Sequence, residues 1–256
     1  MAQARLRVPS KKVQFSTATA FNAILNIVKE TFMKYIQTHQ PVIEAANHIA
    51  AAIKHHLANG ERVLWLLSGG SGTAIAIAAS ERLADTDFTN LSVTMTDERY
   101  GPLGHPDENW QQIMDAGFSA PGATLYRPLS GGDIASTAAA WGLWLTRTLD
   151  TTDFAIGIFG IGADGHTAGI KPHTSATAAT RAIAAFTGDD FERLTITFPV
   201  IKRLDEVVIQ ASGDDKAAII RELLAGHGAL DDTPAQILTT VPDSTLYTTI
   251  NQENIS

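Results

Sequence analysis

Two hydrophobic patterns alternate along most of the chain. Short apolar or alternating runs of strand length occupy residues 61–67, 91–95, 154–159, 193–201 and 206–212. Longer segments with helical periodicity occupy residues 71–84, 105–118, 133–149 and 214–226. Strands that alternate with helices predict a mostly parallel sheet. The sequence therefore predicts an α/β fold, a doubly wound sheet with helices on both faces.

The first sixty residues show a different pattern. They predict a short strand at 12–15 and then helix from about Phe21 to Gly60. The helix should break before Pro41, because the residue before a proline is disfavoured in the α conformation. No linker, repeat or low-complexity stretch separates this segment from the α/β core at 60–256. We expect the N-terminal strand and helices to pack as part of a single domain, 1–256.

Composition narrows the possible partners of the protein. The chain has 256 residues, 19 of them basic and 27 acidic, for a net charge of −8. This charge disfavours nucleic acid or an anionic membrane as the main partner. There is no cysteine, which excludes disulfides and thiolate chemistry. The eight histidines are scattered and His55 and His56 are adjacent, so we expect no metal site.

Localisation and assembly are less clearly marked. The chain shows no apolar signal-peptide core near its start and no apolar run approaching the length of a membrane span. We therefore expect a cytoplasmic protein. No residue pattern marks an oligomeric state, and we favour a monomer.

The segment Gly160–His166 contains G-x-G-x-x-G directly after an apolar strand. A dinucleotide fingerprint would open a helix and have an acidic residue about 20 positions later, at the end of the next strand. Pro172 interrupts any such helix and no suitable acid follows, which disfavours a dinucleotide. Asp164 and His166 could instead form a carboxylate-oriented general base on a flexible loop. A solvated loop with an ordinary histidine is the alternative.

A second glycine-rich turn, residues 68–72, joins an apolar strand to a helix. Gly69, Gly70 and Ser71 could bring backbone N–H groups and a helix N-terminus to a phosphate. A tight turn that needs glycine for its geometry alone is equally consistent with these residues. Ser71 or Thr73 is expected to cap the helix.

Charged residues stand at three further element boundaries. Asp97, Glu98 and Arg99 follow the strand at 91–95, where open α/β sheets collect ligand-binding groups. Arg193 begins a strand, and Lys216 lies early in the helix at 214–226. A surface ion cluster and solvated cations are the alternatives.

Together these motifs resemble the 6-phosphogluconolactonases, which share a Rossmann-like fold with the glucosamine-6-phosphate deaminases. The resemblance runs from about Gly60 to Tyr247. It covers the GGS loop, the DER motif, the DGHTA motif, an Arg-led strand, a Lys before a helix and a late Pro-Ala-x-x-Leu at 234–238. The deaminases carry motifs similar to DEY and DGHIAF at these positions, so the DER and DGHTA motifs of this chain favour the lactonases. His105-Pro106 resembles the deaminases, whereas Asn109 suits the lactonases too.

Three segments depart from the lactonase pattern. The phosphate loop reads GGSGTA in place of the usual GGSTP, which leaves open which hydroxyl meets the phosphate. Residues 169–172 read Gly-Ile-Lys-Pro in place of Ser-Leu-Phe-Pro, which changes the packing of the loop or adds a cation. Residues 245–249 lack the Trp-x-x-Asp expected there.

The resemblance implies hydrolysis of 6-phospho-D-glucono-1,5-lactone to 6-phosphogluconate without metal or cofactor. His166 would be the base, oriented by Asp164, and Arg99 would stabilise developing negative charge. The implied phosphate-binding residues are Gly69, Gly70, Ser71, Arg193 and Lys216. Further site candidates are Asp97, Glu98, Asn109, Gly165 and Thr167. The alternatives are a glucosamine-6-phosphate deaminase and a sugar-phosphate-sensing module, although no DNA-recognition helix is recognisable.

Overall fold

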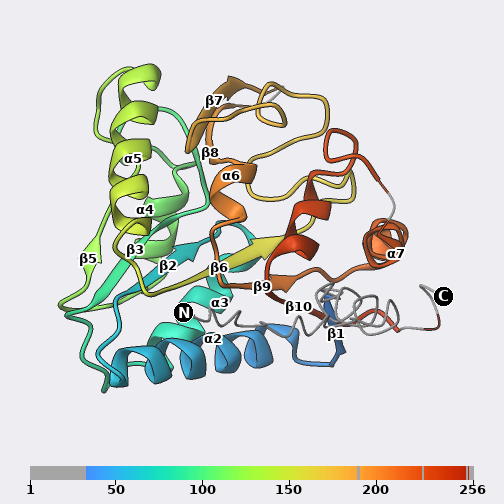
Figure 1. Cartoon of the computed structure of the whole chain (residues 1–256), viewed down its shortest axis with the longest axis horizontal. Coiled ribbons are helices and arrows are strands. Elements are labelled where there is room, and N and C mark those ends of the chain that lie inside the picture. Colours follow the sequence, from blue (N-terminus) through green and yellow to red (C-terminus); the bar gives the residue numbers. More distant parts are fainter. Residues whose placement is uncertain (1–32, 189–190, 227, 252, 254–256) are drawn as a thin grey trace, which may run out of the picture. The chain divides into compact units, whose positions relative to one another are not determined.

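Seven parallel strands form the main sheet (Figure 1). This computed structural model describes residues 33–188, 191–226, 228–251 and 253. The strand order is β1-β10-β9-β6-β2-β3-β5, and each neighbouring pair is parallel. The strands are β1 (Lys34–Gln37), β2 (Val63–Leu67), β3 (Leu91–Met95), β5 (Thr124–Leu125), β6 (Phe154–Gly160), β9 (Glu206–Gln210) and β10 (Asp243–Thr248).

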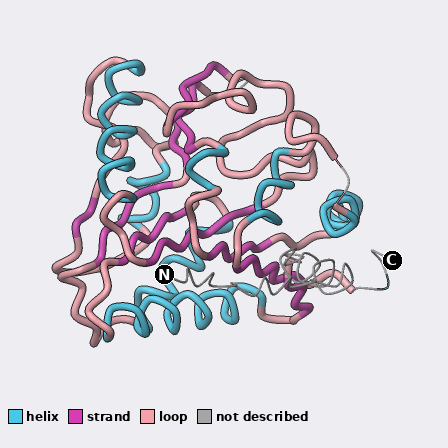
Figure 2. The backbone as a smooth tube through the Cα atoms, in the orientation of Figure 1, coloured by secondary structure: helices cyan, strands magenta, loops and turns pink. Residues whose placement is uncertain are grey.

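Helices cover both faces of this sheet (Figures 1 and 2). On one face lie α2 (Pro41–Ala58) and α3 (Ser71–Arg82); on the other lie α5 (Ile134–Leu149), α6 (Phe198–Ile201) and the 3-10 helix η2 (Pro234–Thr240). All five residues of β2 are buried, because a parallel strand between two helical layers has no solvent-facing side. The predicted doubly wound α/β fold is confirmed. In the described residues no helix is long and apolar enough to cross a membrane.

The order in which the chain adds strands to the sheet reverses between β2 and β6. From β2 the chain proceeds through β3 to β5 at one edge, whereas from β6 it proceeds through β9 to β10 toward the other. Ligands of open α/β sheets bind at the carboxyl ends of the strands at such a switch point. The turn after β2 and the loop after β6 therefore emerge side by side at that edge.

A second, smaller sheet is antiparallel and has the order β4-β8-β7. Its strands are β4 (Asp97–Arg99), β7 (Ile183–Thr187) and β8 (Glu192–Ile196). The backbone of Thr96 joins the two sheets, since its N–H donates to the carbonyl of Leu67 and its carbonyl accepts from the N–H of Ile196. This junction places the DER segment beside the switch point.

Two predicted elements differ from the structure. The run at 193–201, predicted as one strand, ends at Ile196, and residues 198–201 form α6 because Pro199 suits the first turn of a helix. The helix predicted from Phe21 to Gly60 is interrupted by β1, which pairs with β10, and α2 starts at Pro41 where the break was predicted. The strand expected at 12–15 and any helix before residue 33 lie outside the described residues.

Two further helices carry or flank the motifs. The helix predicted around 105–118 is α4 (Asn109–Asp115). The helix predicted at 214–226 begins as a 3-10 helix, η1 (Asp214–Lys216), and continues as α7 (Ala217–Ala225). It ends at Gly226, whose φ of 67° is the left-handed conformation that favours glycine at a helix end.

The carboxylate of Glu98 joins β4 to the start of α4. It is fully buried, and it accepts hydrogen bonds from the backbone N–H groups of Arg99 (2.8 Å), Asn109 (2.6 Å) and Trp110 (2.9 Å). Burial raises the pKa of Glu98 to about 8, although the three N–H groups lower it. Glu98 therefore holds the DER segment against the backbone at the start of α4.

We expect Glu98 to make the stability of the protein fall as pH rises. Its pKa is higher in the folded protein than the 4.5 of an ordinary glutamate, so the folded state holds the proton more tightly. The stabilisation is complete below about pH 4.5 and is lost as pH rises through about 8. A shift of one pKa unit corresponds to about 1.4 kcal/mol, which makes the effect measurable.

Urea unfolding of the wild type and of Glu98→Gln between pH 5 and 8.5 measures this dependence. The wild type should lose its stability advantage over the variant as pH rises, because glutamine does not titrate. An advantage that stays constant or grows with pH would contradict the raised pKa.

Candidate active site

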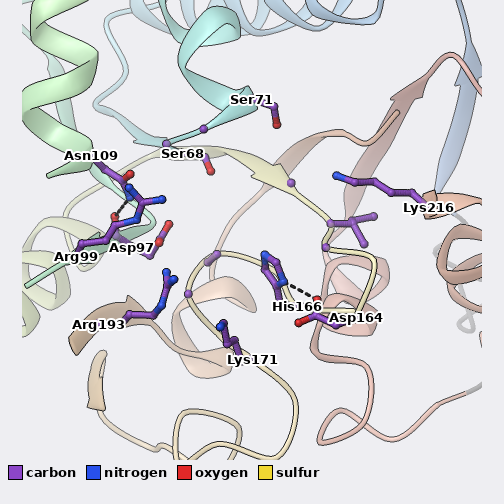
Figure 3. A pocket seen from close by; sticks show the side chains of 17 residues that line it. Ser68, Ser71, Asp97, Arg99, Asn109, Asp164, His166, Lys171, Arg193 and Lys216 are labelled. Carbon is purple, nitrogen blue, oxygen red and sulfur yellow. Dashed lines mark hydrogen bonds and ion pairs between the residues drawn. The ribbon is translucent and has the colours of Figure 1, made fainter. Parts of the chain in front are cut away.

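A cavity of about 400 Å³ opens at the carboxyl ends of β2 and β6 (Figure 3). Six separate segments contribute to it: the turns after β2 and β6, the DER segment, the start of α4, β8 and η1. The lining residues are Ser68, Gly69, Gly70, Ser71, Asp97, Arg99, Asn109, Gly160, Ile161, Gly162, Asp164, His166, Ala168, Gly169, Lys171, Arg193 and Lys216. The turns after β2 and β6 reach the cavity from the switch edge of the main sheet, and the backbone junction at Thr96 brings the DER segment and β8 to the same place.

The glycine-rich turn brings the N-terminus of α3 to the cavity wall. Gly70 is the N-cap of α3, with a φ of 56° that favours glycine. No side chain caps this helix, so the expectation that Ser71 or Thr73 would do so is wrong. A Cβ on Gly69 would lie 2.1 Å from Oδ1 of Asn109, so a side chain at this position would displace Asn109. The residues of the turn line the cavity, so an anion there can reach the helix terminus.

Asp164 and His166 form a hydrogen-bonded pair in the loop after β6 (Figure 3). Nδ1 of His166 lies 2.5 Å from Oδ1 of Asp164, and the backbone N–H of His166 donates to the same oxygen at 3.2 Å. Partial burial by itself raises the pKa of Asp164. The backbone N–H, the charge and the ring of His166 together lower this pKa by more, so the net shift is downward. An ionised Asp164 holds the proton on Nδ1, which leaves Nε2 as the basic atom.

Glycines and backbone contacts fix the position of this pair. A Cβ on Gly162 would lie 2.0 Å from Nδ1 of His166, so the imidazole occupies the space of a missing side chain. Thr167 is fully buried and its hydroxyl donates to the carbonyl of Gly160. The carbonyl of Gly165 accepts from the N–H of Ala235, which belongs to the late Pro-Ala-x-x-Leu motif. Gly165 and Thr167 thus shape the loop and do not line the cavity.

Arg99 and Arg193 face each other across the β4–β8 pair. Each guanidinium carbon lies 5.7 Å from the centroid of the Phe191 ring, within the range of a cation–π interaction. Arg99 also donates from one terminal nitrogen to the carbonyl of Asp107 at 3.0 Å. Like charges directly opposite each other on neighbouring strands repel. The pair is therefore suited to a nearby anion.

Asp97 is the buried carboxylate next to these arginines. Burial raises its pKa, while the positive charges of Arg99 and Arg193 oppose the shift. Asn109 donates from Nδ2 to the carbonyl of Asp97 at 3.1 Å. Its Oδ1 is buried and has no hydrogen-bond partner among the described residues. That atom packs against Gly69, at the side of the glycine-rich turn.

Most of the predicted site residues meet at this cavity. Glu98, Gly165 and Thr167 lie outside its lining. Arg193, expected to bind the phosphate together with Lys216, lies opposite Arg99 on the neighbouring strand, and Figure 3 shows Arg193 and Lys216 on opposite sides of His166. Within the described residues no cluster of three or more His, Cys, Asp or Glu side chains could hold a metal ion.

The structure adds lining residues for which the sequence reasoning assigned no role. Ser68 and Gly162 fall inside motifs that were recognised, but only the folded loops show that they face the cavity. Gly169 and Lys171 fall in the segment whose sequence departs from the lactonase pattern. The added cation at Lys171 was the signal that pointed to this segment.

Known proteins resemble this chain in sequence and in fold. A lactonase from Synechocystis sp., named 6-phosphogluconolactonase, is 30% identical over 67% of this chain and 75% of its own. A protein from Beutenbergia cavernae, named glucosamine-6-phosphate deaminase, is also 30% identical, over 65% and 71%. The crystal structure of a 6-phosphogluconolactonase from Thermotoga maritima is 18% identical, superposes with a TM-score of 0.71 and covers 85% of this chain and 98% of its own.

A model of one protein family matches residues 37–247, from β1 to β10. The matched range contains every residue that lines the cavity. The chain therefore belongs to the family described as glucosamine-6-phosphate isomerases/6-phosphogluconolactonase.

Proposed function

We propose that this protein is a cytoplasmic enzyme that hydrolyses 6-phospho-D-glucono-1,5-lactone to 6-phosphogluconate. The observation that carries the proposal is that one cavity is lined both by the Asp164–His166 pair and by the N-terminus of α3. A phosphorylated lactone needs both, an anion site for its phosphate and a base that acts on its ester carbon. Relatives named 6-phosphogluconolactonase support this choice of substrate.

The phosphate would bind at the glycine-rich turn. Backbone amides and a hydroxyl are presented at the start of α3 by Gly69, Gly70 and Ser71. Lys216 adds a positive charge on the side of His166 where Ser71 also lies (Figure 3). The phosphate takes no part in the chemistry. Its binding energy positions the lactone at the other end of the substrate against the imidazole.

Nε2 of His166 would remove a proton from water as the water oxygen attacks the lactone carbonyl. Asp164 holds the ring in the required tautomer and stabilises the imidazolium that forms. The tetrahedral intermediate then breaks its bond to the ring oxygen, which takes the proton back from Nε2. The scheme balances without a covalent intermediate, a metal or a cofactor.

Arg99 and Arg193 would stabilise the negative charge that develops on the carbonyl oxygen. Their side chains line the cavity on the far side of His166 from Lys216 (Figure 3). Asp107, through its carbonyl, and Phe191, through its ring, hold Arg99 in place. The proposal assigns Arg193 to the acyl end of the substrate, whereas the resemblance implied the phosphate end.

A deaminase acting on glucosamine 6-phosphate is the second candidate function. The Beutenbergia cavernae relative is as similar in sequence as the lactonase from Synechocystis sp.. Phosphate binding and a carboxylate-oriented histidine would serve either reaction. The guanidinium of Arg99 favours the lactonase, because it supplies charge for an oxyanion. The deaminase motif resembles DEY and has a tyrosine at this position.

A direct assay separates the two candidates. We expect the purified protein to accelerate acid release from freshly generated 6-phosphogluconolactone, measured by pH-stat and corrected for spontaneous opening. It should release no ammonia from glucosamine 6-phosphate under the same conditions. Ammonia release without lactone hydrolysis would favour the deaminase.

Replacing the base should abolish most of the turnover. His166→Ala is expected to lower kcat by about 10²-fold or more, the usual contribution of a general base, with a small change in KM. The control is His39→Ala, since His39 is exposed and does not line the cavity. A His166→Ala variant that keeps full kcat would exclude this residue as the base.

Replacing the phosphate-end cation should affect binding. Lys216→Met is expected to raise KM about tenfold and to change kcat little, because a charged hydrogen bond to the inert phosphate is lost. Lys202→Met is the matched control on the exposed surface. Equal losses in kcat and kcat/KM would place Lys216 at the reacting atoms instead.

A further inference from the structure

We propose that the ion pair between Arg127 and Glu108, which lies outside the lining of the cavity, positions the guanidinium of Arg99 for the reaction. The inference rests on the proposed function, which places Arg99 at the developing negative charge. It adds two positioning residues to the site, and it gives a role to the His105-Pro106 motif that resembles the deaminases.

The guanidinium of Arg99 takes its orientation from a loop. One terminal nitrogen donates a hydrogen bond to the backbone carbonyl of Asp107 at 3.0 Å. The Nε of Arg99 is buried and has no hydrogen-bond partner among the described residues. The ring of Phe191, 5.7 Å from the guanidinium carbon, adds a cation–π contact. The position of the Asp107 carbonyl therefore sets the direction in which the guanidinium points.

The loop that carries Asp107 has no regular structure of its own. Residues 100–108 connect β4 to α4 without forming a helix or a strand. Nε2 of His105 donates to the backbone carbonyl of Arg99 at 3.0 Å. The imidazole also fills the space beside Gly101, where a Cβ would lie 2.9 Å from the ring. His105 thus ties the middle of the loop to the backbone of Arg99.

A buried carboxylate holds the end of the same loop. Glu108 is fully buried, and its Oε2 accepts from the N–H of Gly104 at 2.6 Å. Arg127, in the segment after β5, donates to both carboxylate oxygens at 2.6 Å and to Oε1 of Gln111 at 3.1 Å. A bidentate pair fixes orientation as well as distance. Because Glu108 follows Asp107 directly, this pair sets the backbone from which the Asp107 carbonyl projects.

The geometry links Arg127 to the reaction by one route. Arg127 does not line the cavity, so it acts on a substrate through Glu108, the Asp107 carbonyl and then Arg99. Arg99 would stabilise charge that develops only in the transition state. The phosphate end of the site does not depend on this loop. A displaced loop is therefore expected to lower kcat and to leave KM nearly unchanged.

Arg127→Lys tests this route, because lysine keeps the positive charge beside Glu108 but cannot form the two parallel hydrogen bonds. It should lower kcat about tenfold with little change in KM, since a misplacement of about 1 Å at a reacting group can cost more than that. In an Arg99→Met background the same substitution should cause no further loss, because residues that act as a unit are not additive. These assays use enough enzyme to exceed spontaneous opening of the lactone.

The matched control is Arg62→Lys. Arg62 forms a similar bidentate pair with Asp153, and neither residue lines the cavity, so this variant should turn over as the wild type does. Thermal melting verifies that each variant is folded. Should Arg127→Lys fail to fold, Arg127→Met combined with Glu108→Gln removes both charges together and is measured in the same way.

A second readout does not need the reaction. The Nε–H resonance of Arg99 in isotope-labelled protein is identified by its absence in Arg99→Met. It should shift in Arg127→Lys and stay in place in Arg62→Lys, because only the first substitution releases the Asp107 carbonyl.

Two results would overturn the positioning role. An equal loss of kcat with and without Arg99 would show that Arg127 acts independently of that guanidinium, and an unchanged kcat in Arg127→Lys would remove it from the reaction. Failure of the proposed function looks different. A wild type that does not hydrolyse the lactone rejects that function, and the Arg99 resonance then decides the positioning role by itself.

Discussion

The parallel pairing of β2 with β6 is the constraint on which the whole site depends. Val63 pairs with Phe154 and Leu66 with Gly157, so the carboxyl ends of both strands point to the same edge of the sheet, where β6 continues past the end of β2 to Gly160. The turn that ends at the N-terminus of α3 and the loop that carries His166 both start from these ends. A shift of one residue in this register would turn buried side chains of β6 to the opposite face, and the fully buried environment of both strands opposes it.

Close packing against glycines then converts neighbouring loops into a fixed geometry. Asn109 fills the space beside Gly69, His166 that beside Gly162, and Thr195 that beside Gly169. Each contact joins two segments that are distant in the chain or holds a side chain against its own loop. The result is a preorganised imidazole beside a preorganised glycine-rich turn, which would spare the proposed reaction the cost of ordering them.

The cavity also reverses the sign of the protein's charge locally. The chain carries a net charge of −8, yet Arg99, Lys171, Arg193 and Lys216 line a single cavity. Holding these cations together costs energy through mutual repulsion, and Asp97 and the ring of Phe191 offset part of that cost. A cavity with this many cations would favour the anionic ligand of the proposed function.

Hydrophobic patterning was enough to predict the α/β class and the strands β2, β3, β6 and β9, because buried parallel strands are apolar runs. The loops that follow β2 and β6 could also be predicted, because their turns are rich in glycine. It did not reveal β1, β5, β7 or β10, which are short or lack a clear apolar pattern, nor that 193–201 would leave the main sheet and end in a helix. Only the tertiary structure decided that Arg193 lies opposite Arg99, that Glu98 points to the backbone of α4 and that Lys171 returns to the cavity. Those placements depend on strand pairing and loop packing between segments far apart in the chain, and local sequence carries no record of which distant backbone will satisfy a given hydrogen bond.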